Sequence, residues 1–398
     1  MSINNEAFAT KFTGELDKIL CSKTAVGFMT DNALRAKFVG AKTVKLPSIS
    51  MQGLGDYDRD TGFIKGSVNV TNTAYTMQQD RARTFSIDRE DMDETGIAEL
   101  AGSVISEFVR TKVVPETDAY TISKLAGLAY ERGQLVEGDT ENPFDCFFAL
   151  QKEVQAEVGF DEELVCFVNP YMWSKFKQSE EFIRQIAPGE FKQGDMSFSV
   201  NTIDGIAIIP VSASRMQSAY EFLSGSEGEE AGGFTPANGA KGIYMLMLPK
   251  RAASLVRKSE KIRIFTPDEN ISADAYKFDY RLYYDVFVKT SFASGVWAMI
   301  APYITVTSDV AASKSLTEGS ISGSLSVTAT ASDSSELTYQ WYMCSDESKN
   351  GAVRIAGATD KSWTIDTSLT SGEYYVFVRI TAGGSTVLDS SVCHITVA

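Results

Sequence analysis

The chain has 398 residues, 43% of them apolar, and a formal net charge of −15. This length is long for one core and indicates two or three domains, and the apolar fraction is that of a globular protein. The acidic balance argues against a protein that wraps nucleic acid through phosphate contacts, because such contacts need clustered Lys and Arg.

The cysteines and the N-terminal residues favour a protein of a reducing compartment. The five cysteines form no CxxC pair, and an odd count spread this widely does not indicate a disulfide framework. Residues 5–20 mix apolar and charged side chains, so they predict an amphipathic helix rather than a secretory signal. The uncharged run 290–308 contains Gly, Pro, Ser and Thr, so it predicts a buried strand rather than a membrane span.

Residues 42–88 predict two strands joined by a long loop. Apolar and polar residues alternate on both sides of a segment, 53–66, that is rich in Gly and Asp. Few side chains of this segment can serve a core of their own. We therefore expect an extended hairpin that rests on a neighbouring subunit.

The spacing of apolar residues and the positions of proline residues predict three helices. A stripe that begins near Gly96 continues through Phe108, and Pro115 should bend the helix. We expect Phe108 to anchor this helix on its sheet. Asn-Pro pairs start two more helices, 142–158 and 169–186. Strands are expected at 164–168, 205–211 and 242–248 with a surface loop at 225–239, which together indicate an α+β domain.

Residues 276–288 predict one long strand. Tyr, Phe, Leu and Val occupy the even positions, and charged residues, Asp285 among them, occupy odd ones. At ~3.3 Å per residue this strand would span roughly 40 Å, about twice a typical strand. Compact enzymes seldom need such a strand, whereas thin wall-forming subunits do.

From Pro302 onward the composition turns to Ser, Thr, Gly and Val, and short strands recur between turn signals. This pattern predicts a β-sandwich. Trp341 stands where an immunoglobulin-type domain has its core tryptophan, and Tyr374 stands at the tyrosine-corner position. Val327 and Val376 occupy the places of the usual cysteine pair.

Several segments resemble the major capsid proteins of tailed bacteriophages. The matching residues are 54–59 (LGDYDR), 80–88 (DRARTFSID), 113–120 (VVPETDAY) and 274–285 (DAYKFDYRLYYD). The resemblance covers residues 1 to about 301. The remainder resembles the immunoglobulin-like modules of bacteria and phages.

The resemblance implies a domain over 1–301 with an N-terminal arm, an extended loop, a peripheral domain with a spine helix, and an axial domain, followed by an immunoglobulin-like domain over 302–398. Such subunits form pentamers and hexamers that close an icosahedral shell around packaged DNA, which they bind without sequence specificity. A portal is an implied partner, and either a separate scaffolding protein or none is implied. No scaffolding segment is expected before the extended loop.

Five residues are the candidates for contacts between subunits. They are Tyr57, Arg59, Lys65, Arg81 and Arg83. Some relatives cross-link subunits through a Lys–Asn bond, and Lys65 lies in the loop. No matching Asn or catalytic Glu is recognised, so we expect no cross-link.

The sequence favours neither an enzyme nor a metal or cofactor site. The only histidine, His394, lies near the C-terminus, which excludes imidazole chemistry elsewhere. Residues 56–60 have the spacing of a calcium loop, but Thr61 and Ser67 replace its Gly and Glu. A basic run over 250–263 is read as a subunit contact rather than a DNA-binding surface.

The favoured interpretation is a non-enzymatic capsid subunit found in the virion and assembled in the bacterial cytoplasm. Two alternatives remain open at this point. One is an encapsulin-type nanocompartment shell protein, and the other is an adhesin or carbohydrate-binding protein built around the last hundred residues. The immunoglobulin-like domain is expected to face outward and to contact host-surface or mucus glycans weakly; no membrane contact is expected.

Overall fold

The computed structural model describes residues 24–33, 37–39, 42–57, 59–60, 63–90, 105–136, 142–179, 186–193, 196–226, 229–237, 240–332, 336–382 and 386–398. The chain divides into two compact units, Met1–Ile300 and Ala301–Ala398. The predicted domain division at 301/302 lies next to this break, and the identity of each domain stays a prediction. The expected helix at 5–20 and the expected helix start near Gly96 fall outside the described residues.

The first unit contains a mixed seven-stranded sheet of order β5-β15-β12-β6-β9-β8-β7. Its strands are β5 (Leu135–Val136), β6 (Leu164–Val168), β7 (Ile186–Gln193), β8 (Met196–Ile203), β9 (Ile206–Pro210), β12 (Ile243–Pro249) and β15 (Trp297–Ile300). Every residue of β6 and β12 is buried. Their uninterrupted apolar sequences are those of strands covered on both faces.

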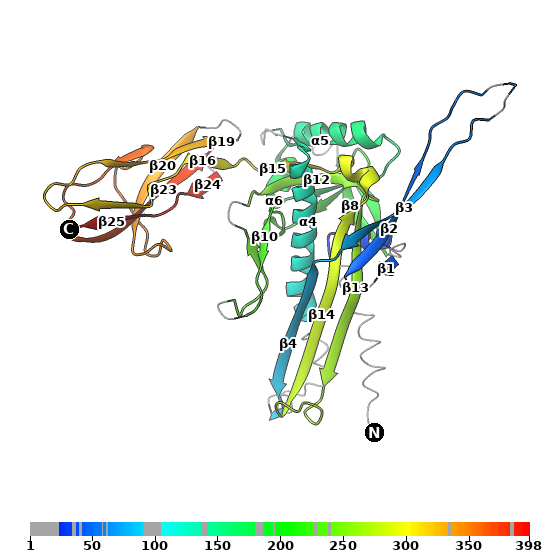
Figure 1. Cartoon of the computed structure of the whole chain (residues 1–398), viewed down its shortest axis with the longest axis horizontal. Coiled ribbons are helices and arrows are strands. Elements are labelled where there is room, and N and C mark those ends of the chain that lie inside the picture. Colours follow the sequence, from blue (N-terminus) through cyan, green and yellow to red (C-terminus); the bar gives the residue numbers. More distant parts are fainter. Residues whose placement is uncertain are drawn as a thin grey trace. The chain divides into compact units, whose positions relative to one another are not determined.

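Two helices that both begin at an Asn-Pro pair belong to this part of the unit (Figure 1). The helix α5 (Pro143–Val158) ends at Gly159, whose φ of 82° suits glycine. The helix α6 (Pro170–Gln178) begins at Asn169, whose side chain accepts a hydrogen bond from the Met172 amide at 2.9 Å. The prediction that α6 continues to residue 186 is wrong, because the backbone turns extended at Ser179 and Ile186 opens β7.

Two other sequence expectations need correction. Part of the expected loop 225–239 is a strand, since β10 (Tyr220–Phe222) pairs with β11 (Phe234–Pro236). The run 290–308 is not one strand. It forms a 3₁₀ turn, η4 (Thr290–Gly295), then β15 and β16 (Ile304–Ser308), with Pro302 between the two strands. Proline interrupts a strand because it has no N–H to donate.

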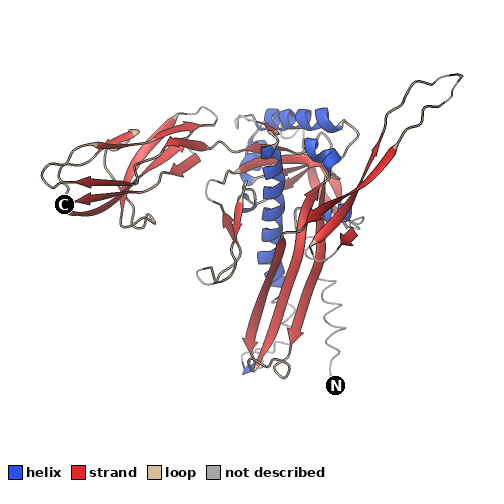
Figure 2. Ribbon diagram, viewed as in Figure 1, coloured by secondary structure: helices blue, strands red, loops and turns tan. Residues whose placement is uncertain are grey.

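A second sheet of the first unit is long and narrow (Figure 2). It consists of β13 (Ala253–Phe265), β14 (Ala275–Val288) and β4 (Gln79–Asp88), in the order β13-β14-β4. The predicted long strand is thus present as the central strand, and its 14 residues span roughly 45 Å at ~3.3 Å per residue. One face carries Phe278, Tyr280 and Leu282, all buried.

The opposite face of β14 is buried continuously toward its C-terminal end. The sequence identified the even positions as the buried face, but Tyr283, Asp285 and Phe287 occupy odd positions and all three are buried. Tyr283 and Phe287 pack with Val44 and Met77 from the base of the hairpin. The hairpin therefore covers this end of the sheet and encloses Asp285.

The predicted bent helix is present from Ile105 in the described part of the chain. A π-helical turn, η2 (Val109–Val113), precedes the helix α4 (Val114–Glu131). The Val114 amide bonds to the Val109 carbonyl, one residue further back than in an α-helix. Pro115 follows at once, and its missing N–H accounts for a change of helical pitch at this place.

The extended hairpin is also present, as β2 (Thr43–Met51) and β3 (Val68–Thr76) in Figure 1. The strands pair in unbroken antiparallel register from Thr43–Thr76 to Met51–Val68. The short strand β1 (Lys37–Val39) pairs with the first residues of β2. Residues 52–67 form the tip beyond the ladder.

The second unit consists of strands. They are β16, β17 (Ser313–Leu316), β18 (Ser324–Ser326), β19 (Thr328–Ala331), β20 (Leu337–Cys344), β21 (Val353–Arg354), β22 (Ser362–Thr364), β23 (Gly372–Ala382), β24 (Thr386–Asp389) and β25 (Cys393–Val397). A six-stranded sheet and two pairs, β16-β19 and β18-β22, enclose one apolar cluster.

The residues that suggested an immunoglobulin-like domain lie in or beside the core of the second unit, and the identity of that domain stays a prediction. Trp341 is fully buried, and Val327 and Val376 belong to the same core. The Tyr374 hydroxyl donates to the Thr370 carbonyl at 2.9 Å, which is the bond of a tyrosine corner. Cys344 is not part of that core cluster, although Cys393 is, and both thiols are free.

Among the described residues, no helix combines the length and apolar character needed to cross a membrane.

Phe108 packs edge-to-face against Phe85, with centroids 4.8 Å apart, and against Tyr280 at 5.6 Å. We predict that Phe108→Asp lowers the free energy of unfolding by several kcal/mol, because it places a carboxylate among these rings. Urea unfolding of the first unit measures the loss. Phe160→Asp is the control, since Phe160 is 83% exposed. Equal stability of the two variants would contradict the packing role of Phe108.

Candidate subunit-contact surfaces

The hairpin tip presents large apolar side chains to solvent. Tyr57 is 61% exposed, Phe63 is 89% exposed and Leu54 is fully exposed. The exposed apolar residues of the hairpin are Met51, Leu54, Tyr57, Phe63, Ile64, Val68 and Val70. The rings of Tyr57 and Phe63 meet edge-to-face at 5.1 Å. Among the residues that the structure describes, none covers this surface.

Two of the predicted contact residues, Arg59 and Lys65, lie on the same tip and are exposed. They flank the apolar surface with positive charge, while Asp56 and Asp60 are exposed beside them. Asp58 of the calcium-like spacing lies outside the described residues. The structure thus brings Tyr57, Arg59 and Lys65 together at one end of the hairpin.

Arg81 does not belong with them, because its guanidinium is engaged within its own chain. Its Nε lies 2.7 Å from the Glu116 carboxylate on α4. Its two Nη atoms donate to the carbonyls of Leu223 at 2.9 Å and Gly233 at 3.1 Å. Within its own chain Arg81 therefore ties together β4, α4 and the loop that joins β10 to β11, and its expected contact with another subunit stays a prediction.

Arg83 makes a related contact from the next outward position on the same face of β4. Its Nη2 donates to the Glu230 carbonyl at 2.8 Å, and its side chain remains exposed. Gly225 and Gly232 have positive φ and lie against this guanidinium, where a side chain would be crowded. The two arginines together hold the loop 223–233 above the long sheet.

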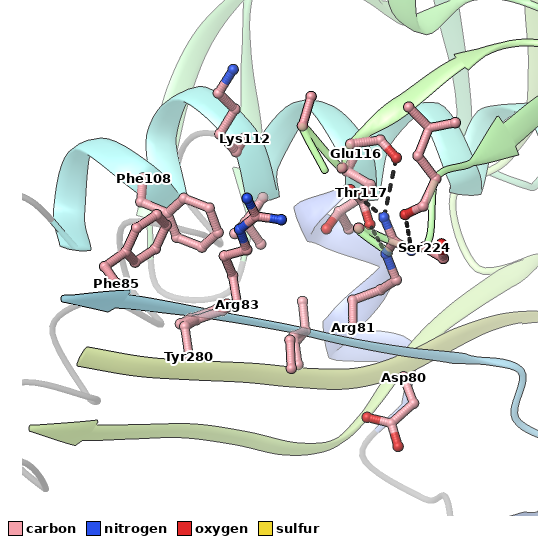
Figure 3. A pocket seen from close by; sticks show the side chains of 18 of the residues that line it. Asp80, Arg81, Arg83, Phe85, Phe108, Lys112, Glu116, Thr117, Ser224 and Tyr280 are labelled. Carbon is pink, nitrogen blue, oxygen red and sulfur yellow. Dashed lines mark hydrogen bonds and ion pairs between the residues drawn. The ribbon is translucent and has the colours of Figure 1, made fainter. Parts of the chain in front are cut away.

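A pocket of about 290 Å³ lies between this loop, the helix and the sheet (Figure 3). Phe85, Phe108 and Tyr280 form its apolar side. Arg83 and Lys112 project at its rim, whereas the Asp80 carboxylate points away from it (Figure 3). That carboxylate pairs with Arg281 at 2.6 Å. Sequence reasoning missed the pocket because its walls come from segments far apart in the chain.

A buried carboxylate fixes the base of the hairpin. Asp285 is fully buried, and one oxygen lies 2.6 Å from Lys124 Nζ and 2.8 Å from the Tyr120 hydroxyl. The other oxygen accepts from the Gln78 amide at 2.9 Å, between β3 and β4. This one side chain connects the helix, the long sheet and the hairpin.

A second buried carboxylate, Asp118 on α4, joins the helix to two further segments. It pairs with Arg215 at 3.0 Å and accepts from the Val26 amide at 3.4 Å. Burial raises the pKa of Asp118 to about 6, although the charge of Arg215 acts in the opposite direction. The effect of burial on the pKa is the larger one, because the carboxylate is fully enclosed while Arg215 keeps some contact with solvent.

Other candidate chemistry is accounted for by ordinary contacts. Lys250 and Arg251 of the basic run pair with Glu163 and Glu162 at 2.8 Å and 3.0 Å. The imidazole of His394 stacks on a tyrosine ring at 4.7 Å. Within the described ranges, no three His, Cys, Asp or Glu side chains gather into a group that could hold a metal ion.

No protein-family model and no curated protein matches the chain. Among solved structures, it is similar to the mature capsid of bacteriophage PhiM1, with 12% identity, a TM-score of 0.41 and coverage of 65% of this chain and 82% of that chain. The capsid of cyanophage P-SCSP1u gives 12% identity, a TM-score of 0.41 and coverage of 67% and 85%. The procapsid of satellite phage P4 gives 11% identity, a TM-score of 0.40, and coverage of 72% of this chain and 90% of that chain.

The raised pKa of Asp118 predicts how stability depends on pH. Between the ordinary value of 3.8 and about 6, the folded chain retains a proton that the unfolded chain has lost. The free energy of unfolding should therefore fall, by about 3 kcal/mol, as the pH rises through this window. Denaturant titrations of the wild type and Asp118→Asn at pH 4 and pH 7 isolate the effect. A wild type whose stability stays constant or rises relative to Asp118→Asn between pH 4 and pH 7 would contradict it.

Proposed function

We propose that the chain is the major capsid protein of a tailed bacteriophage, a subunit that assembles into a closed shell. The observation that carries this proposal is the hairpin with its exposed apolar tip. A folded chain that projects such a surface is incomplete until another molecule covers it. A second copy of the chain is the partner that a shell supplies at every position.

The hairpin is too poorly supported to be a free appendage. A two-stranded hairpin is marginally stable alone in water. Of the hairpin side chains that the structure describes, those that pack in the apolar cluster with the long sheet lie at the base, and they are Val44, Tyr75 and Met77. Tyr57, Phe63 and Leu54 at its end contribute nothing to the core. A contact between subunits that forms on assembly explains why these apolar side chains are exposed in the single chain.

The long sheet supports the same function. β13 and β14 run side by side for twelve registered pairs, and α4 packs on one face through Tyr120 and Tyr284. This arrangement gives an extended layer one helix thick, which suits a subunit that forms part of a wall. The sequence segments that resemble tailed-phage capsid proteins, 80–88, 113–120 and 274–285, lie in β4, α4 and β14.

The proposal also includes the form of the shell, its partners and the orientation of the second unit. Pentamers and hexamers would close an icosahedral shell around DNA, with a portal and a separate scaffolding protein as partners, in a virion assembled in the host cytoplasm. The subunit would act without catalysis. The second unit would face outward, because its residues 302–398 carry ten acidic and five basic side chains. Packaged DNA would repel this net negative charge.

An encapsulin-type compartment is the second candidate from the same structural class. The free second unit favours the phage, since a surface module can meet host or mucus glycans weakly and at many points. Particles purified from expressing cells discriminate the two by their contents. A cargo protein held inside every particle would favour the compartment.

We predict that replacing Phe63 and Ile64 of the tip by Asp leaves a folded subunit that forms no shells. The change lies on exposed side chains, so circular dichroism should match the wild type, while the contact between subunits loses its apolar surface. Electron microscopy and size exclusion chromatography measure assembly. Ile271→Asp, at another fully exposed apolar residue, should assemble normally. Shells from the tip variant would remove the hairpin from the assembly mechanism.

We predict that a chain ending at Ala301 still forms shells of unchanged diameter. The second unit encloses its own core around Trp341, and the core cluster of the first unit contains no residue of the second, so each unit is expected to fold by itself. Electron microscopy should show the same particles without surface knobs. Truncated protein that stays monomeric, or knobs on the inner wall of wild-type shells, would contradict the outward assignment.

A further inference from the structure

We propose that one face of the second unit is a binding site for acidic saccharides, sugar chains that carry carboxylates. The inference rests on the proposed function, and it adds a site and a ligand class to the weak glycan contact of this unit. The site lies on the side of β20 and β23 that points away from the core. We call it the cationic face, and it comprises Gln340, Tyr342, Lys349, Arg354, Phe377 and Arg379.

The register of the strands brings these side chains together. Successive side chains of a strand point to opposite faces of the sheet, and Trp341 of β20 points into the core. Its two neighbours, Gln340 and Tyr342, therefore lie on the outer face. Their register partners on β23 are Arg379 and Phe377. Two aromatic rings, an amide and a guanidinium thus stand side by side on the sheet.

The rings hold two cations at defined positions. Tyr342 and Phe377 stack with their centroids 5.3 Å apart. The Arg379 guanidinium lies over the Tyr342 ring at 5.2 Å, and the Lys349 ammonium lies over the Phe377 ring at 5.0 Å. The electron-rich face of an aromatic ring attracts a cation. Phe377 is 1% exposed although it lies outside the core cluster, so the side chains of the outer face cover it.

Lys349 reaches its place from a tight turn in which its own backbone is strained. Its φ of 62° lies in the left-handed region, which lysine seldom adopts. The turn is closed by the Lys349 amide, which donates to the Asp346 carbonyl at 3.1 Å, and by the Asn350 side chain, which donates to the Asp346 carboxylate at 2.8 Å. Strain of this kind is typical of functional positions.

Arg354 offers the most accessible cation of the face. It pairs across the sheet with Tyr342 and is exposed. Its Nε donates to the side-chain oxygen of Gln340, whose amide group in turn donates to the Ile355 carbonyl at 2.8 Å. This anchored guanidinium retains N–H groups in the fork geometry that matches a carboxylate. A site whose donors are already oriented binds without an ordering cost.

The charge of the cationic face opposes that of the unit around it. Residues 302–398 carry ten acidic and five basic side chains, and three of the five basic ones lie on this face. Arg379 pairs with Asp389 at 2.7 Å. In the described part of the second unit, no carboxylate forms an ion pair with Arg354 or Lys349. A positive face on an acidic unit selects an acidic ligand, because the rest of the surface repels it.

The same face favours a sugar chain over an acidic protein surface. Protein interfaces bury an apolar centre, whereas the apolar ring of Phe377 is already covered. The groups that reach solvent are guanidinium, ammonium, amide and phenol groups, which bind the carboxylates and hydroxyls of a sugar. Many weak contacts of this kind add up when the copies of a shell engage one glycan layer.

Binding of the full chain to two immobilised glycans tests the ligand class. Lactose and sialyllactose differ by one sugar, and that sugar carries a carboxylate. At equal surface density we expect at least about tenfold tighter binding to sialyllactose, with a preference that weakens as the salt concentration rises. Equal binding to both glycans, or binding to neither, would overturn the proposal.

Variants of matched charge locate the site. Arg354→Glu should weaken binding to sialyllactose about tenfold, whereas Lys361→Glu, an equal change of charge at an exposed residue outside the cationic face, should leave it unchanged. Lys349→Asn should also weaken binding, because Asn accepts a positive φ but carries no ammonium. Equal losses from Arg354→Glu and Lys361→Glu would show an effect of net charge alone and overturn the site.

Two further outcomes separate this proposal from its alternatives. Shells in which the second unit of a neighbouring copy covers Arg354 would assign the cationic face to a contact between copies and overturn the glycan site. Loss of sialyllactose binding from intact shells of Arg354→Glu would support the site, since assembly is unaffected. A wild type that binds the glycan but forms no shells would also support the site and would count against the proposed function alone.

Discussion

The architecture of the first unit depends on one buried carboxylate. Asp285 lies in the central strand of the long sheet. One of its oxygens binds Lys124 and Tyr120 of the helix, and the other binds the Gln78 amide between β3 and β4. Removing one partner of a buried ion pair typically costs 3–5 kcal/mol, because the remaining charge stays desolvated. The directions of the helix, the sheet and the hairpin are therefore set together.

This constraint explains how a thin hairpin can act at a distance from its own core. Its base is clamped by Asp285 and by the packing of Val44 and Met77 on Tyr283, so the ladder up to Met51–Val68 projects in a defined direction. The apolar tip is thereby presented rather than folded back. Elsewhere in the unit, the half-buried Arg81 and the exposed Arg83 of β4 hold the loop between β10 and β11, and Arg81 also pairs with Glu116 on the helix.

Local patterns in the sequence predicted the helices and strands, but they did not predict the contacts between elements that lie far apart in the sequence. Alternation predicted β14, Asn-Pro and Gly predicted the bounds of α5, and the Gly- and Asp-rich segment predicted the hairpin tip. The burial of Asp285 could not be read in this way, because its partners Gln78 and Lys124 lie 207 and 161 residues away in the sequence. The contacts of Arg81 within the chain were missed for the same reason, since no local pattern around Arg81 indicates Glu116 or the carbonyl of Gly233 as its partners.

The central claim is that the exposed hairpin is completed by another copy of the chain. Electron microscopy of the purified full-length protein tests it most directly. The account predicts closed shells in which the density of each hairpin tip, around Tyr57 and Phe63, is covered by a neighbouring subunit. A protein that remains monomeric at high concentration, or shells in which every tip projects freely into solvent, would contradict it.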